Sequence, residues 1–203
     1  MKKYAVLHEP GDIVTLAGTR FVVLDVERRG SLPDSLFLLA LESVGASEFG
    51  SSNNYAESDL KKAVDKWLED MGKRGLDNAK LIPREIDLTP LDGSGCYGKL
   101  SVKAAPLTLD EAREYADIIP NAERWCWLAT GWSGPSKSDG DLALYVYSNG
   151  DWYGRSCSSS YGIRPALKIP SDLLLDSADK PDLSEVPTDT LLEEIRRRVV
   201  DKA

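Results

Sequence analysis

The stretch that decides the fold is DLALYVYS-NG-DWYGRSCSSSY-GIRPALKI, residues 141–169. Two strand-like runs lie on either side of Asn149 and Gly150, a pair that is typical of the tight turn in a β-hairpin. Both residues tolerate the positive φ that a two-residue type I′ turn requires. We therefore expect an antiparallel hairpin centred on this pair.

A two-residue turn would also set the register of this hairpin. Tyr147 would face Trp152, and Val146 would face Tyr153. Aromatic cross-strand pairs of this kind contribute roughly 0.2–1 kcal/mol each to stability. A third run at 163–169 contains Pro165, which cannot donate a backbone hydrogen bond and so belongs at an edge, a bulge or a strand start.

The segments before residue 60 predict an antiparallel meander. Strands are expected over 12–17, 20–27 and 35–42, separated by turns. The last of these is almost wholly apolar, as in a strand buried on both faces, although its length also fits a short helix. A polar loop is expected over 45–55.

Two helices are predicted from their capping residues. Ser58 precedes a stripe of apolar residues that runs to Met71, and Gly72 is a natural stop. Thr108 and Glu111 have the spacing of a capping box that opens a second helix. An apolar strand over 124–130 and a long polar loop over 131–140, with an exposed tryptophan, lead into the hairpin.

Composition narrows the function classes. The net charge of −8 and the pI near 4.8 argue against nucleic-acid binding. The sequence contains no run apolar and long enough for membrane insertion, and no signal peptide is recognised. One histidine and three widely spaced cysteines make a metal site unlikely to assemble, so we expect no metal and no cofactor.

The chain divides into three parts. Residues 1–170 are expected to form one domain of the α+β class, with mostly antiparallel sheets and two helices. Residues 171–187 have the composition of an acidic linker. Residues 188–203 predict a C-terminal amphipathic helix, which must pack on something because a short helix is marginal alone in water.

Four short motifs resemble a family of bacterial and phage domains with a C-type-lectin-like fold, in the variant shared with formylglycine-generating enzymes. They occur in the family's order and end in Gly-Ile-Arg-Pro-Ala-Leu, which is the most specific: Trp67-Leu68, Trp127–Thr130, Asn149–Asp151 and Gly162–Leu167. The resemblance covers about residues 12–169. It implies a displayed binding domain. Because no signal peptide or membrane-spanning run is recognised, we expect the protein to be cytoplasmic or associated with a phage particle. Calcium-lectin motifs and the closely spaced cysteine pair of formylglycine-generating enzymes are not recognised.

Some proteins of this fold group are variable proteins of diversity-generating retroelements, in which template adenines are mutated. Changing only the adenines of an AAC codon can reach Asn, Ser, Tyr, Asp, Gly, Arg and Cys, among other residues. Apart from Trp152, residues 148–162 consist of these types alone. Any polar hairpin is also rich in such residues, so both interpretations stay open.

The favoured function is therefore a non-enzymatic ligand-binding domain, with a protein or a glycan as ligand. The binding face is expected on the 131–140 loop and the 148–162 hairpin, where aromatic, serine and arginine side chains suit recognition: Trp132, Trp152, Tyr153, Arg155, Ser156, Ser158, Ser159, Ser160 and Tyr161. No catalytic residue is assigned. The alternatives are an enzyme of the same fold, or an assembly protein that self-associates through its C-terminal helix.

Overall fold

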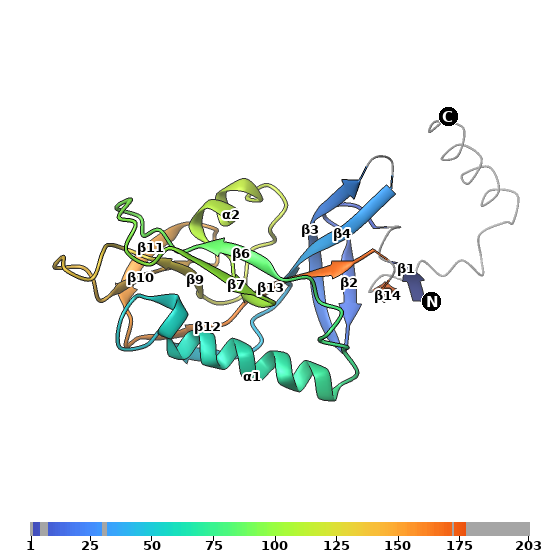
Figure 1. Cartoon of the computed structure of the whole chain (residues 1–203), viewed down its shortest axis with the longest axis horizontal. Coiled ribbons are helices and arrows are strands. Elements are labelled where there is room, and N and C mark those ends of the chain that lie inside the picture. Colours follow the sequence, from blue (N-terminus) through green and yellow to red (C-terminus); the bar gives the residue numbers. More distant parts are fainter. Residues whose placement is uncertain (1, 5–7, 30–31, 172, 178–203) are drawn as a thin grey trace, which may run out of the picture.

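The computed structural model describes residues 2–4, 8–29, 32–171 and 173–177. Within these residues the chain forms a seven-stranded sheet, a five-stranded sheet, a two-stranded sheet and two α-helices (Figure 1). Nearly all strand pairs are antiparallel, and the exception is one parallel bridge in the five-stranded sheet. The expected α+β class with mostly antiparallel sheets is confirmed.

The larger sheet contains the predicted meander. Its strands, in spatial order, are β1 (Lys2–Tyr4), β14 (Leu174–Ser177), β2 (Ile13–Leu16), β3 (Thr19–Arg29), β4 (Leu32–Ala40), β13 (Pro165–Pro170) and β8 (Ala104–Pro106). The three expected strands correspond to β2, β3 and β4, so the apolar run at 35–42 is a strand and not a helix. Pro165 begins β13, one of the places where a proline is tolerated.

The smaller sheets are built from shorter strands. The five-stranded sheet has the order β11 (Trp152–Ser156), β10 (Leu142–Val146), β9 (Cys126–Gly131), β12 (Ser160–Gly162) and β5 (Ala46–Glu48). The two-stranded sheet pairs β6 (Arg84–Asp87) with β7 (Lys99–Val102). Strand β5 lies in the segment that we expected to be a polar loop. It is a strand because its backbone pairs with β12 at the edge of the five-stranded sheet.

The two helices lie on opposite sides of the sheets (Figure 1). Helix α1 (Asp59–Lys73) begins where predicted, with the Ser58 hydroxyl accepting a hydrogen bond from the Lys61 N–H. It runs one residue past Gly72. Helix α2 (Leu109–Glu114) begins with the predicted capping box. Neither helix is long and apolar enough to cross a membrane, and this holds for every helix in the described ranges.

Strands β3 and β4 are buried on both faces, which divides the core in two. Phe21 and Leu36 belong to one cluster, which packs on α1. Val22 and Phe37, their neighbours in sequence, belong to the other cluster, which packs on α2. Successive residues of a strand point to opposite faces, so a continuous apolar run is what two cores require.

The segment 171–187 was expected to be an acidic linker, but its first part contains a strand of the larger sheet. Strand β14 pairs with both β1 and β2, so the larger sheet extends to Ser177 rather than ending near residue 170. The strand itself has the sequence Leu-Leu-Asp-Ser, and backbone pairing to two neighbours holds it in the sheet. The remainder of the segment and the expected helix over 188–203 lie outside the described residues.

The hairpin of β10 and β11 has a register shifted by one residue from the prediction. Val146 pairs with Trp152, and Tyr145 pairs with Tyr153. A shift of one residue moves a side chain to the other face of the sheet. The predicted aromatic pair between Tyr147 and Trp152 is therefore wrong, and a tyrosine–tyrosine pair takes its place.

The cause of the shift is the turn, which has three residues, 148–150. The Tyr147 N–H donates to the Asp151 carbonyl at 2.7 Å, and the Gly150 N–H donates to the Tyr147 carbonyl at 3.1 Å. Gly150 alone takes the left-handed conformation, with φ of 92°. Asn149 instead accepts the Asp151 N–H on its side chain at 3.1 Å, which fits a type I turn followed by a bulge.

A two-residue turn of the predicted kind does occur, but between β2 and β3. Leu16 pairs with Thr19, and both central residues have positive φ, 47° at Ala17 and 76° at Gly18. Ala17 is the only non-glycine residue with positive φ among those described. The left-handed conformation costs an L-residue about 1–2 kcal/mol, so this turn is strained at one position.

We expect Ala17→Gly to raise the free energy of unfolding by about 1 kcal/mol, since glycine removes this strain. Gly18→Ala is the matched control and should lower it by a similar amount. A Cβ at Gly18 would meet no atom within 4 Å, so its effect would come from the backbone alone. Urea denaturation of both variants measures this, and a destabilised Ala17→Gly variant would contradict it.

Candidate ligand-binding surface

The residues expected on a single binding face lie on two faces of the sheet. Along β11, alternation directs Tyr153 and Arg155 to one side and Trp152 and Gly154 to the other. The predicted set was drawn from one continuous segment, without regard to this alternation. Each side therefore has to be described separately.

On one side, five aromatic rings pack together. Tyr145 stacks on Tyr161 with ring centroids 4.7 Å apart, and Trp125 lies 4.5 Å from Tyr147. Tyr153 meets Tyr147 edge to face at 4.9 Å. We call these five side chains the aromatic face. Tyr145 is buried, whereas Trp125 is 37% exposed and Tyr153 is 51% exposed, so the cluster presents rings to solvent.

Polar groups border the aromatic face. The Arg155 Nε donates to the Tyr161 hydroxyl at 3.3 Å, and this bond raises the pKa of Arg155. Desolvation raises the pKa of the Tyr145 hydroxyl. An open groove of about 400 Å³ adjoins the rings, lined in part by Trp125, Tyr161 and Arg124. The surface can thus offer ring faces, a guanidinium and hydroxyl groups to a ligand.

Trp132 does not belong to this surface. It was expected to be exposed, but it is half-buried and packs against the cluster that contains Leu128 and Leu144. Its ring lies so close to Gly154 that a Cβ there would be 2.3 Å from Cε3 of the tryptophan. The missing side chain at Gly154 makes the space that the indole occupies.

Trp152 lies on the same side as Trp132. It is 37% exposed, and the guanidinium carbon of Arg113 lies 5.0 Å from the centre of its ring. Arg113 belongs to α2, so Trp152 faces the helix and is separated from the aromatic face by the sheet.

The four predicted serines form the bend between β11 and β12. The hydroxyl oxygens of Ser156 and Ser158 lie 3.0 Å apart, and the Ser159 N–H donates to the Ser156 carbonyl at 2.9 Å. Ser158 and Ser160 are exposed, and Ser160 lines the open groove. Of the four serines, Ser160 is therefore available to a ligand beside the aromatic face, whereas Ser158 is exposed next to Ser156.

The long loop over 131–140 is held at both ends. The Asp92 carboxylate accepts the Lys137 Nζ at 2.7 Å and the Gly134 N–H at 3.2 Å, and the contact with Lys137 lowers the pKa of Asp92. The Asn53 amide donates to two backbone carbonyls, of the loop and of β10, at 2.8 and 3.0 Å. These contacts fix the base of the hairpin.

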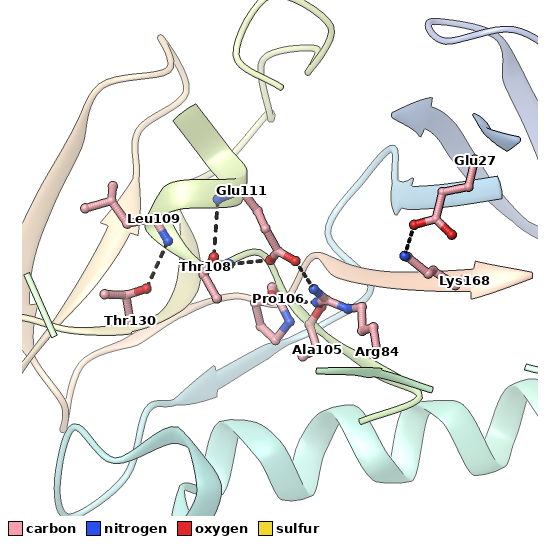
Figure 2. Close-up of polar contacts among 9 residues, drawn as sticks. All are labelled: Glu27, Arg84, Ala105, Pro106, Thr108, Leu109, Glu111, Thr130 and Lys168. Carbon is pink, nitrogen blue, oxygen red and sulfur yellow. Dashed lines mark hydrogen bonds and ion pairs between the residues drawn. The ribbon is translucent and has the colours of Figure 1, made fainter. Parts of the chain in front are cut away.

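Helix α2 is positioned by a buried arginine (Figure 2). Arg84 forms an ion pair with Glu111 and donates from Nη2 to the carbonyls of Ala105 and Pro106 at 2.9 and 3.1 Å. Glu111 also accepts the Thr108 N–H at 2.8 Å as part of the capping box. The start of the helix is therefore tied to strands β6 and β8.

The cysteines do not provide a nucleophile near this surface. All three are free thiols, of which Cys96 is exposed. Burial raises the pKa of Cys126 to about 11 and that of Cys157 to about 12, so both are protonated near neutral pH. In the part of the chain that the structure describes, no group of three or more His, Cys, Asp or Glu residues could hold a metal ion.

Sequence reasoning missed Trp125, Tyr145 and Tyr147 as members of the surface. The sequence contained a signal for this surface, because Trp125 and Trp127 are two residues apart, as are Tyr145 and Tyr147. Spacing of two places such side chains on one face of a strand. Pairing of β9 with β10, which brings these two sets together, is a tertiary feature.

Comparison of the chain with protein-family models, with curated proteins and with solved structures finds no match.

We expect Gly154→Ala to lower the free energy of unfolding by about 1–3 kcal/mol, because the new methyl group would displace the Trp132 ring. Gly95→Ala is a suitable control, since a Cβ there would meet no atom within 4 Å and its φ is not in the left-handed region. Urea denaturation followed by tryptophan fluorescence would measure both. Equal stability of the two variants would show that Trp132 does not need the space at Gly154.

Proposed function

We propose that this chain is a non-enzymatic recognition domain that binds a protein or a glycan through the aromatic face. The observation that carries the proposal is the exposure of Trp125 and Tyr153 on a packed cluster of rings. Contiguous apolar rings that remain in contact with water favour a ligand that covers them. Arg155, which is bonded to Tyr161, and Ser160, which lines the adjoining groove, supply polar groups at the border.

The packing of the rings favours recognition on entropic grounds. Each exposed ring is braced by another, as Tyr153 is by Tyr147. A side chain held in place before binding loses little conformational freedom when the ligand arrives. Aromatic residues with arginine at the centre of an interface commonly dominate its binding energy.

Within the α+β class, we propose the C-type-lectin-like fold that the sequence motifs resemble. The motif Gly162–Leu167 runs from the end of β12 in the five-stranded sheet into β13 of the seven-stranded sheet. The most specific part of the resemblance thus forms the connection between the two sheets. Its Arg164 is buried, and its Nε donates to the carbonyl of Ala40 in β4 at 2.7 Å.

A further part of the proposal is that a retroelement diversifies residues 148–162. The structure restricts which of these positions can vary. The exposed side chains of Tyr153, Arg155 and Ser158 can change without disturbing the core. Gly154 cannot, because of Trp132, and a Cβ at Gly162 would be 2.8 Å from the Cys126 sulfur. We expect variation at exposed positions and constancy at these two glycines.

The binding proposal is tested on a glycan array and with a displayed peptide library. Any ligand found should bind Tyr153→Ala and Trp125→Ala at least about tenfold more weakly. Trp152→Ala is the matched control, because Trp152 and Trp125 are both 37% exposed but lie on opposite faces. Loss of binding in Trp152→Ala alone would place the site on the other face, and the absence of any ligand would count against the proposal.

Diversification is tested at the gene locus. We expect a near-copy of the segment that encodes residues 148–167, with mismatches confined to template adenines, beside a reverse-transcriptase gene. Sequencing the locus decides this. An intact locus without such a copy would leave a binding domain of fixed specificity.

A further inference from the structure

A second cavity lies on the opposite side of the sheet from the aromatic face. It has a volume of about 410 Å³ and is enclosed by α2, the segment 116–122 and the tip of the hairpin. Its walls are mostly apolar and include Leu107, Leu128 and Val146. Pockets that hold small molecules in proteins have volumes of about 300–1,000 Å³ and a few polar groups among apolar walls.

Arg164 is the polar group in the inner wall of this cavity. It is only 7% exposed, its Nε donates to the Ala40 carbonyl at 2.7 Å and its Nη1 donates to the Pro120 carbonyl at 3.0 Å. Its Nη2 has no hydrogen-bond acceptor among the described residues. Glu42, whose charge acts on Arg164, forms its own ion pair with Arg20.

A buried guanidinium without a carboxylate partner is unusual. Burial lowers the pKa of Arg164, which reflects the cost of keeping its charge away from water. An orphaned polar atom in the interior of a protein calls for an explanation, and a role in ligand binding is one. An anion beside this side chain would both neutralise the charge and accept the free N–H.

The outer part of the cavity suits an apolar group. Trp152 and Val146, which are cross-strand partners, both line it, and Arg113 lies over the Trp152 ring at 5.0 Å. Asp151 at the hairpin tip is exposed and offsets the charge of Arg113, which leaves Arg164 as the uncompensated positive charge among the lining residues. The polarity of the cavity thus runs from a guanidinium inside to an aromatic ring near the opening.

We infer that this cavity binds a small carboxylic acid with an apolar body, whose carboxylate meets Arg164 and whose body lies along Trp152. Nη2 is sealed from solvent in this structure, so binding through this atom requires the guanidinium or its surroundings to shift. One neighbour of the guanidinium is the irregular segment 117–122, whose Pro120 carbonyl accepts a hydrogen bond from Nη1. The cavity shares Tyr147 with the aromatic face, but this inference does not rest on the function proposed for that face.

The test uses phenylbutyrate and the corresponding alcohol, phenylbutanol, which have the same apolar body and differ in the carboxylate. Titration of the whole chain is followed by NMR, through the indole N–H of Trp152 and the Nε–H of Arg164. Phenylbutyrate should shift both signals to saturation, and phenylbutanol should bind at least about tenfold more weakly, as expected for loss of a charge-assisted hydrogen bond. Equal affinity, or no saturable shift with phenylbutyrate, would overturn the inference.

Two variants locate the site. Ala112→Phe should fill the cavity and abolish the shifts, because Ala112 lines it, whereas Ala79→Phe at an exposed position outside it should leave them unchanged. Arg164→Lys should weaken phenylbutyrate selectively and reduce its preference over phenylbutanol. If Arg164→Lys does not fold, the Ala112 variant still decides the location. Full binding in Ala112→Phe would overturn the proposed site.

Discussion

The ion pair between the buried Arg84 and the half-buried Glu111 is the contact on which the rest of the arrangement depends. It joins a two-stranded sheet, the end of β8 and the start of α2 through an arginine that is only 5% exposed. Removing Glu111 would leave the charge of this arginine uncompensated, and in a fully buried pair such a loss costs about 3–5 kcal/mol. A helix as short as α2 does not persist alone in water, so this tie decides where it lies.

The position of α2 has consequences for both faces of the five-stranded sheet. On its own side the helix covers Leu128 and Leu144 and encloses the cavity that contains Arg164. On the other side, Trp125 and Tyr153 stay exposed at the hairpin end of the sheet. Strands β9, β10 and β11 thus support a recessed cavity with a buried cation on one face and an open surface of rings on the other. These two environments suit ligands of different size and chemistry.

Local signals in the sequence predicted local structure well. Ser58, Thr108 and Glu111 marked the helix starts because capping bonds join residues only three apart. The meander was predicted because alternation and turns are also short-range features. The hairpin was located correctly, but its register was not, because Asn149 bonds through its side chain and only Gly150 takes positive φ. Strands β5 and β14 escaped prediction since pairing, rather than composition, holds them.

For the candidate site, the sequence by itself determined which chemistry is available: aromatic rings, serines and arginines concentrated in and around residues 141–169. It also determined the alternation that gives each strand two faces. Only the tertiary structure decided which face each ring occupies, that Trp132 lies beneath Gly154, and that Arg164 lines a cavity. The physical reason is that these outcomes depend on pairing between strands far apart in the chain, where one residue of register exchanges the inside for the outside.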